Sequence, residues 1–222
     1  MKRETIIDKL PSHAECFKTI RSAKIYIRDY KHYDLDLARN NENRGVVIDD
    51  NPDPNWASVV LENAMFDGLA IDADCFPENA LPNEEAGSHA SQCECVIFPA
   101  DGNDEDWLLF IETKYTDSEE VAQKDDVNYP KKMFSQIKST VNYFRQKGII
   151  ASDKPDKRVH AIMSYPKLLE PFDSWNIPLE DVDEETGDVL QLTTEEIMQR
   201  YKIHLRPTNH ALIRSAKRIK LG

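Results

Sequence analysis

Two apolar segments joined by a polar turn carry acidic and basic side chains at a common end. The first, residues 93–98, has Glu94 near its start, and the second, residues 107–115, has Glu112 and Lys114 near its end. Their length and apolar content predict two strands of a hairpin. Side chains of a strand alternate between its faces, so Glu112 and Lys114 point the same way. Charged groups at the mouth of a buried sheet are costly unless paired or metal-bound, so the pattern predicts a candidate site for metal-assisted chemistry.

A helix is expected after this hairpin. Pro130 suits a first helical position, and Gly148 suits a C-terminal stop. Four apolar residues between them recur at the spacing of one helical face: Met133, Ile137, Val141 and Phe144. A further strand is expected at residues 159–163.

Shorter elements are expected on both sides of this region. Helices are expected at residues 5–10, at residues 55–66 with Asn55 as the cap, and at residues 193–200, where Thr193 and Glu196 form a capping box. Strands are expected at residues 24–28, 202–205 and 211–221, and loops at residues 40–55, 72–92 and 166–192. This order predicts one domain over residues 1–222, of the α/β (α+β) class, with a small central mixed sheet flanked by helices.

The acid on one strand, the Glu-x-Lys on the next and the following helix resemble the PD-(D/E)XK nuclease superfamily. Residues 136–143, Gln-Ile-Lys-Ser-Thr-Val-Asn-Tyr, are similar to the Gln…Tyr helix motif of its RecB-like branch. The resemblance implies a restriction-endonuclease-like core at about residues 55–165, with an N-terminal extension (1–54) and a C-terminal extension (166–222). It also implies Mg²⁺-dependent hydrolysis of phosphodiester bonds, with Mn²⁺ as a substitute for Mg²⁺.

The same resemblance assigns roles to individual residues. It implies catalytic or positioning roles for Glu94, Glu112, Lys114, Gln136 and Tyr143. Glu94 and Glu112 would hold the metal, with Glu62, on the helix expected at residues 55–66, as a third ligand. Mg²⁺ prefers carboxylate and water oxygens, and it lowers the pKa of a bound water. Lys114 would orient or deprotonate that water, or stabilise charge that develops on the phosphate.

Charge is distributed unevenly along the chain. The net charge is −12, yet residues 200–222 carry seven Lys and Arg residues and no acidic one. Four of these basic residues are candidates for contact with a phosphate backbone: Arg214, Lys217, Arg218 and Lys220. Alternatively, the basic end pairs with the acidic middle of the chain. DNA is the expected partner and RNA the alternative, and a homodimer is a further expectation because many members of the superfamily act as dimers.

Other interpretations of the same residues stay open. Glu112 and Lys114 could form an ordinary ion pair at a strand end, on a catalytically inactive nuclease fold that serves binding or assembly. Cys93 and Cys95, with Cys75 and His89, could hold zinc, but Cys-x-Cys within a strand places both thiols on one face and favours core packing. The chain has no apolar run of about 18 residues and no signal-peptide pattern, so we expect a cytoplasmic protein without membrane contact.

Overall fold

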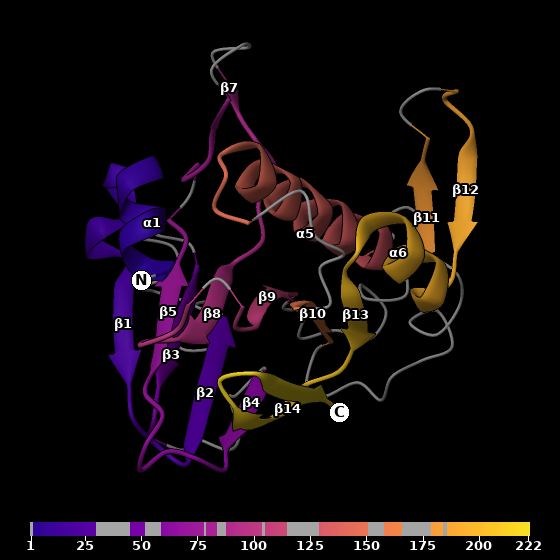
Figure 1. Cartoon of the computed structure of the whole chain (residues 1–222). Helices are drawn as coiled ribbons and strands as arrows, with labels where there is room; N and C mark the ends of the chain where they lie inside the picture. Colours follow the sequence, from indigo (N-terminus) through magenta and orange to yellow (C-terminus); the bar gives the residue numbers. More distant parts are fainter. Residues whose placement is uncertain are drawn as a thin grey trace.

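The computed structural model describes residues 2–29, 45–51, 59–77, 79–83, 88–103, 105–114, 129–150, 158–165, 179–183 and 186–222. Three α-helices occur in these ranges: α1 (Lys2–Lys9), α5 (Tyr129–Gln146) and α6 (Thr194–Tyr201). A short 3₁₀ helix, η1 (Pro11–Glu15), follows α1. The described chain therefore has a mixed α+β fold, as predicted (Figure 1).

The larger sheet has six strands and is mixed. Its order is β1 (Phe17–Ile20), β5 (Ile71–Cys75), β8 (Cys95–Pro99), β9 (Leu108–Thr113), β10 (Val159–Ser164) and β13 (His204–Pro207). The first four strands pair antiparallel, whereas β10 is parallel to both β9 and β13. Parallel neighbours need a long crossover, and α5 lies in the connection from β9 to β10.

A second sheet of five strands combines segments from both ends of the chain. Its order is β15 (Arg218–Leu221), β14 (His210–Ser215), β4 (Val59–Asn63), β2 (Lys24–Asp29) and β3 (Val46–Asp49). Two small antiparallel pairs complete the described strands: β11 (Leu179–Val182) with β12 (Val189–Leu192), and β6 (Pro82–Asn83) with β7 (Ser88–His89).

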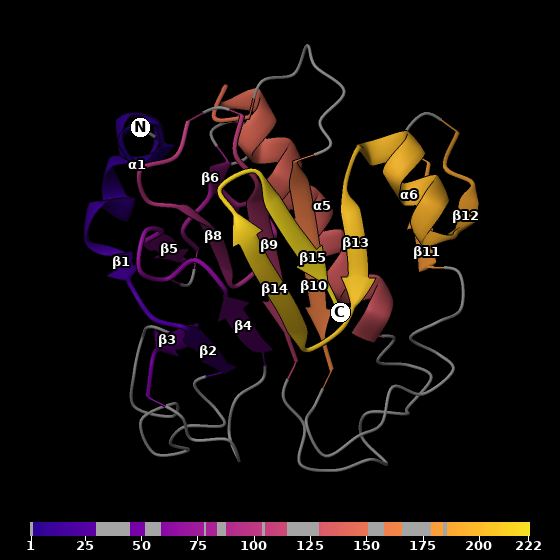
Figure 2. The ribbon, with the colours of Figure 1, turned by 60° about the horizontal axis from the view of Figure 1, so that its bottom comes forward.

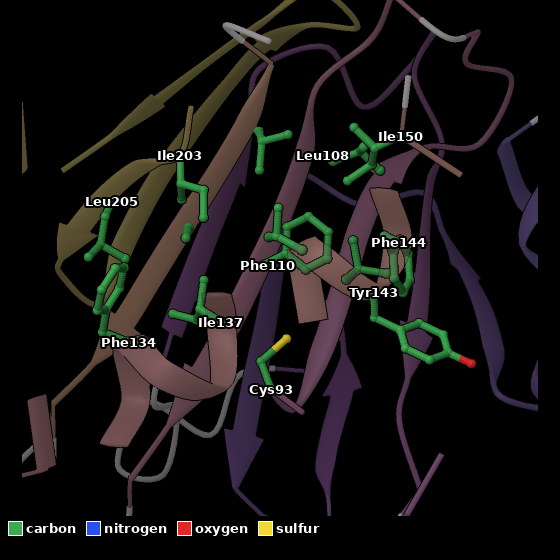
Figure 3. Close-up of a cluster of buried hydrophobic side chains, with 14 of the residues drawn as sticks. Cys93, Leu108, Phe110, Phe134, Ile137, Tyr143, Phe144, Ile150, Ile203 and Leu205 are labelled. Carbon is green, nitrogen blue, oxygen red and sulfur yellow. The ribbon is translucent and has the colours of Figure 1, made fainter. Parts of the chain in front are cut away.

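The six-stranded sheet is the middle of three layers. Alternate residues of β9 explain this arrangement, because Leu108 and Phe110 pack against the helices whereas Leu109 and Ile111 pack against the five-stranded sheet. Figure 2 shows the hairpin of β14 and β15 in front of β9 and β10, with α5 behind them. Figure 3 shows the helix-side core, in which Phe134, Ile137 and Phe144 of α5 lie among residues of the six-stranded sheet.

A buried histidine and aspartate join η1 to the six-stranded sheet. His13 Nδ1 lies 2.8 Å from Asp74 Oδ2, and its Nε2 lies 3.2 Å from the carbonyl oxygen of Ala80. Burial lowers the pKa of His13, but Asp74 more than offsets this and raises it above the ordinary value. Both ring nitrogens face acceptors, which fits a protonated imidazole.

Several predicted elements are confirmed. The two central strands form an antiparallel pair, β8 and β9, and the strand predicted after the long helix is β10. The predicted apolar face of α5 is fully buried, and Gly148 has the positive φ of 70° that suits the end of a helix. The capping box of Thr193 and Glu196 starts α6. Among the described residues no helix is long and apolar enough to cross a membrane.

Other predicted elements are wrong. The helix expected at residues 55–66 is instead strand β4 from Val59 to Asn63, because this segment pairs with β2 and β14 on its two sides; residues 52–58 lie outside the described ranges. The expected loops contain strands: β3 in 40–55, β5 in 72–92, and β11 and β12 in 166–192. The single strand expected at 211–221 is the hairpin of β14 and β15.

Candidate active site

The carboxyl group of Glu112 lies at the end of β9, on the face that packs against α5. The side chain is fully buried. Its Oε1 accepts a hydrogen bond from the ammonium group of Lys114, which also donates to Gln136 Oε1 at 3.0 Å. Its Oε2 has no hydrogen-bond partner among the described residues. A buried carboxylate oxygen without a partner is costly, and such an atom points to a missing ligand or proton.

Helix α5 is attached to the segment that precedes β8 by two hydrogen bonds, and a third within the helix orients Thr140. Gln136 Nε2 donates to the carbonyl oxygen of Gln92 at 2.8 Å. One turn later, Thr140 Oγ1 accepts from the backbone N–H of Cys93 at 2.8 Å and donates to the carbonyl oxygen of Gln136 at 2.9 Å. These bonds fix where β8 begins and therefore the position of Glu94. The sequence analysis did not identify Gln92 or Thr140.

Glu94 directly precedes β8 and lies beside the end of β9 that carries Glu112. The β8–β9 register pairs Cys95 with Ile111, and the N–H of Glu94 donates to the carbonyl oxygen of Ile111 at 3.0 Å. The register ends at Cys95 and Ile111 because the chain bends at Glu94, but the negative charge of Glu94 acts on Lys114, as that of Glu112 does. The structure therefore brings together four of the residues that the sequence singled out: Glu94, Glu112, Lys114 and Gln136.

Asp29 adds a third acid that the sequence analysis missed. It is the last residue of β2, and its Oδ2 accepts from Thr113 Oγ1 at 3.3 Å. Its negative charge acts on both Glu112 and Lys114. The strand expected at residues 24–28 ended one residue before Asp29, and no sequence signal indicated that β2 would end beside β9.

The electrostatics of this group favour a bound cation. Burial is the main cause that raises the pKa of Glu112 from 4.5 to about 7, and repulsion by Asp29 adds to it, against the opposing effects of Lys114 and Gln136. Burial lowers the pKa of Lys114, but the carboxylates of Glu112, Glu94 and Asp29 together raise it above its ordinary value. Three acids thus surround one base, and a divalent cation would relieve their mutual repulsion.

A polar cavity of about 460 Å³ adjoins these residues. Glu94 and Gln136 line it, together with Gln92, Cys93 and His89. Within the described ranges, no group of three or more His, Cys, Asp or Glu side chains is arranged to hold a metal ion. The carboxylates are therefore near one another without forming a closed cage, so most coordination positions of a Mg²⁺ ion here would be left to water, as Mg²⁺ commonly accepts.

Glu62 lies far from this group. It is on β4 rather than on a helix, its Oε1 is 3.7 Å from His210 Nε2, and it pairs with Lys24 in the register of β2 and β4. Lys24 and Asp29 are at opposite ends of β2, which separates Glu62 from the Asp29 end by about 17 Å at 3.3 Å per residue. The expected helical position of Glu62 is therefore wrong, and the structure does not bring this acid to Glu112.

Tyr143 is also separate from the hydrogen bonds of Lys114. It follows Gln136 by seven residues on α5, a distance of about 10 Å along the helix axis. Its ring belongs to the helix-side core, its hydroxyl group points away from that core in Figure 3, and Lys147 Nζ lies 5.5 Å from its ring centroid.

The basic residues of the C-terminal segment lie on β14, β15 and the turn between them. Lys217 Nζ forms ion pairs with Asp106 at 3.0 Å and Glu105 at 3.2 Å, in the connection from β8 to β9. This connection is at the other end of β9 from Glu112, about 20 Å away along the strand. Pairing of the basic segment with the acidic middle of the chain is thus confirmed for Lys217. The side chains of Arg214, Arg218 and Lys220 are exposed.

The cysteines near the site are packing residues. The chain bends at Glu94, so Cys93 packs in the helix-side core and Cys95 in the core between the two sheets. The expectation that both thiols share one face is therefore wrong, whereas their expected burial is confirmed. Burial raises the pKa of both thiols, which disfavours the thiolate that zinc would need.

A buried carboxyl group with a pKa near neutrality, a neighbouring ammonium group and two further acids can bind a hard cation and take part in proton transfer at neutral pH. The nearby cavity gives space for a substrate. Comparison of the chain with protein-family models, with curated proteins and with solved structures found no match.

Proposed function

We propose that the protein is a Mg²⁺-dependent nuclease of the PD-(D/E)XK type that hydrolyses phosphodiester bonds in DNA in the cytoplasm. The observation that carries the proposal is Glu112, whose buried carboxyl group has one oxygen bound by Lys114 and the other without a partner among the described residues. Glu94 directly precedes the neighbouring strand, and its charge acts on the same lysine. Two carboxylates and a lysine at adjacent strand ends suit metal-assisted attack of water on a phosphate.

The order of elements supports the proposed restriction-endonuclease-like core. A helix (α1) precedes three consecutive antiparallel neighbours (β5, β8 and β9), and α5 then leads to the parallel strand β10. The motif acids and the lysine fall at the start of β8 and the end of β9, and the glutamine falls on α5. These are the relative positions that the resemblance implies.

Each residue would have a distinct task. Glu112 and Glu94 would hold the cation, with Asp29 rather than Glu62 as the third acid. When bound, the cation would polarise the phosphate and lower the pKa of a coordinated water. Lys114 would stabilise the negative charge that develops on the phosphate. To reach the phosphate, its ammonium group would have to weaken its hydrogen bond to Glu112. Gln136 would hold the ammonium group of Lys114 in place.

Cleavage assays test this proposal. Single- and double-stranded DNA, with RNA alongside, would be incubated with the wild type and with Mg²⁺, Mn²⁺ or a chelator. We expect metal-dependent cleavage that falls by about 10²- to 10⁴-fold in Lys114→Ala and Glu112→Gln. Glu62→Gln is the matched control, since it also removes one acid, and it should cleave at the wild-type rate.

A catalytically inactive binding or assembly module is the second candidate. It is favoured by the closed ion pair of Glu112 and Lys114 and by the absence, among the described residues, of a group of three metal-ligating side chains. A wild type that leaves all nucleic acids intact, and whose melting temperature does not respond to Mg²⁺ or Mn²⁺, would establish this candidate instead of the nuclease.

A further inference from the structure

A second cavity, of about 600 Å³, lies at the β13 edge of the six-stranded sheet. Residues of α6, β10, β13 and β15 line it, and Figure 2 shows β15 passing close to β10 and β13. On β10, Ala161 belongs to the helix-side core, so its neighbour His160 points to the opposite face, the face away from Glu112. This cavity is therefore separate from the candidate active site.

Basic side chains predominate in this cavity. Its charged and titratable residues are His160, His204, Arg206, Lys220 and Glu195, so that Glu195 is the single acid among them. No ion pair joins Arg206 or Lys220 to a carboxylate in the part of the chain that the structure describes. In a protein with a net charge of −12, such a local excess of basic groups attracts anions selectively.

The two histidines form a flat, stacked pair. His160 and His204 are register partners on parallel strands, with ring centroids 5.1 Å apart and planes inclined by 18°. Arg206 follows His204 by two residues and so shares its face of the sheet. The rings and the guanidinium group together offer planar donors, a geometry well suited to the oxygens of a phosphate group.

The remaining lining is mixed, with Thr194 and Gln199 of α6 as polar residues beside several apolar ones. Ile219 and Leu221 of β15 and Met198 of α6 supply apolar surface in the same cavity as the basic groups. A cavity of this volume holds a small molecule rather than a folded partner. We propose that it binds a phosphorylated small molecule of mononucleotide size, with the phosphate on Arg206 and Lys220 and a planar, weakly polar group against the apolar residues.

Calorimetric titration of the full chain, without added metal, tests this inference. The probes are adenosine 5′-monophosphate, inorganic phosphate and adenosine. We expect the nucleotide to bind with a stoichiometry of one, and phosphate and adenosine to bind at least about tenfold more weakly, because each lacks half of the contacts. The double variant Arg206→Ala/Lys220→Ala should weaken nucleotide binding by about 100-fold or more, since charge-assisted hydrogen bonds are the strong ones.

The double variant Arg214→Ala/Arg218→Ala is the matched control. It removes the same charge from the hairpin of β14 and β15, which also carries Lys220, but neither residue lines the cavity, so its affinity should stay within about twofold of the wild type. Equal losses in both double variants, equal affinity for nucleotide and adenosine, or no saturable binding of the nucleotide would overturn the inference. Glu112→Gln should bind the nucleotide like the wild type, so failure of the proposed nuclease activity and failure of this inference are distinguishable.

Discussion

The buried carboxyl group of Glu112 makes the stability of the fold depend on pH. Its pKa is raised from 4.5 to about 7 in the folded protein. Between these two pH values the folded protein keeps a proton on Glu112 that the unfolded chain releases. The contribution of Glu112 to the free energy of unfolding is therefore fully present below pH 4.5 and is lost as the pH rises through about 7. At about 1.4 kcal/mol per pH unit, the loss above pH 7 approaches about 3.4 kcal/mol.

Glu112→Gln should remove this loss. The amide has nearly the shape of the protonated carboxyl group and does not ionise. We expect the variant to exceed the wild type in free energy of unfolding by about 3 kcal/mol at pH 8.5, and by less than about 0.5 kcal/mol at pH 4.5. For a chain of this length, 3 kcal/mol corresponds to a rise in melting temperature of about 6–12 °C.

Urea unfolding followed by circular dichroism at pH 4.5, 6.5 and 8.5 measures the effect. Glu62→Gln is the control, because Glu62 is partly exposed on β4, and its difference from the wild type should not vary with pH by more than about 0.5 kcal/mol. Saturating Mg²⁺ should stabilise the wild type more than Glu112→Gln at pH 8.5. If Glu112→Gln is instead less stable than the wild type at pH 8.5, Glu112 is a well-compensated anion and the electrostatic reasoning fails.

Three further predictions concern other polar residues of the fold. Asp29→Asn removes a repelling charge, so the midpoint at which wild-type stability falls with pH should move to lower pH in urea unfolding; an unchanged midpoint would exclude Asp29 from the site. Thr140→Val leaves the buried backbone N–H of Cys93 without its acceptor, so the free energy of unfolding should fall by about 1–3 kcal/mol in the same assay. No change in that free energy would mean that a water molecule replaces the hydroxyl group. His13→Leu leaves Asp74 buried without its partner and should cost about 3–5 kcal/mol at pH 8, but less at pH 4, where Asp74 gains a proton; an equal cost at both pH values would refute the pairing argument.

Local patterns in the sequence were sufficient for the elements next to the candidate site. The strands β8 and β9 have continuous apolar runs, and α5 has a clear helical period, so each can be recognised without knowing which distant segments cover it. The same local patterns predicted that Glu112 and Lys114 lie together. Their positions relative to Glu94 follow from the hairpin alone.

Elements stabilised by distant partners were not predictable in this way. Strand β5 contains Asp72 and Asp74, which suggested a loop, but Thr19 and His13 hydrogen-bond to these acids from 53 and 61 residues away. Strand β4 pairs with β14, and their register joins Val60 to His210. No local signal in a five-residue segment reports a partner so far along the chain, and Glu62 was misplaced for this reason.

The pairing of β4 with β14 has a consequence for the order in which the protein folds. Asp29 is held by a sheet that includes strands from both ends of the chain, whereas Glu94, Glu112 and Gln136 come from one contiguous stretch. Pairing at such sequence separation is slow, because the entropy of closing a long loop is lost before any contact between the strands stabilises them. Strand β2 pairs directly with β3 and β4, which follow it closely in the sequence, so Asp29 can be placed on these three strands before the distant pairing forms. The sheet that covers β9 is complete only when β14, near the end of the chain, pairs with β4.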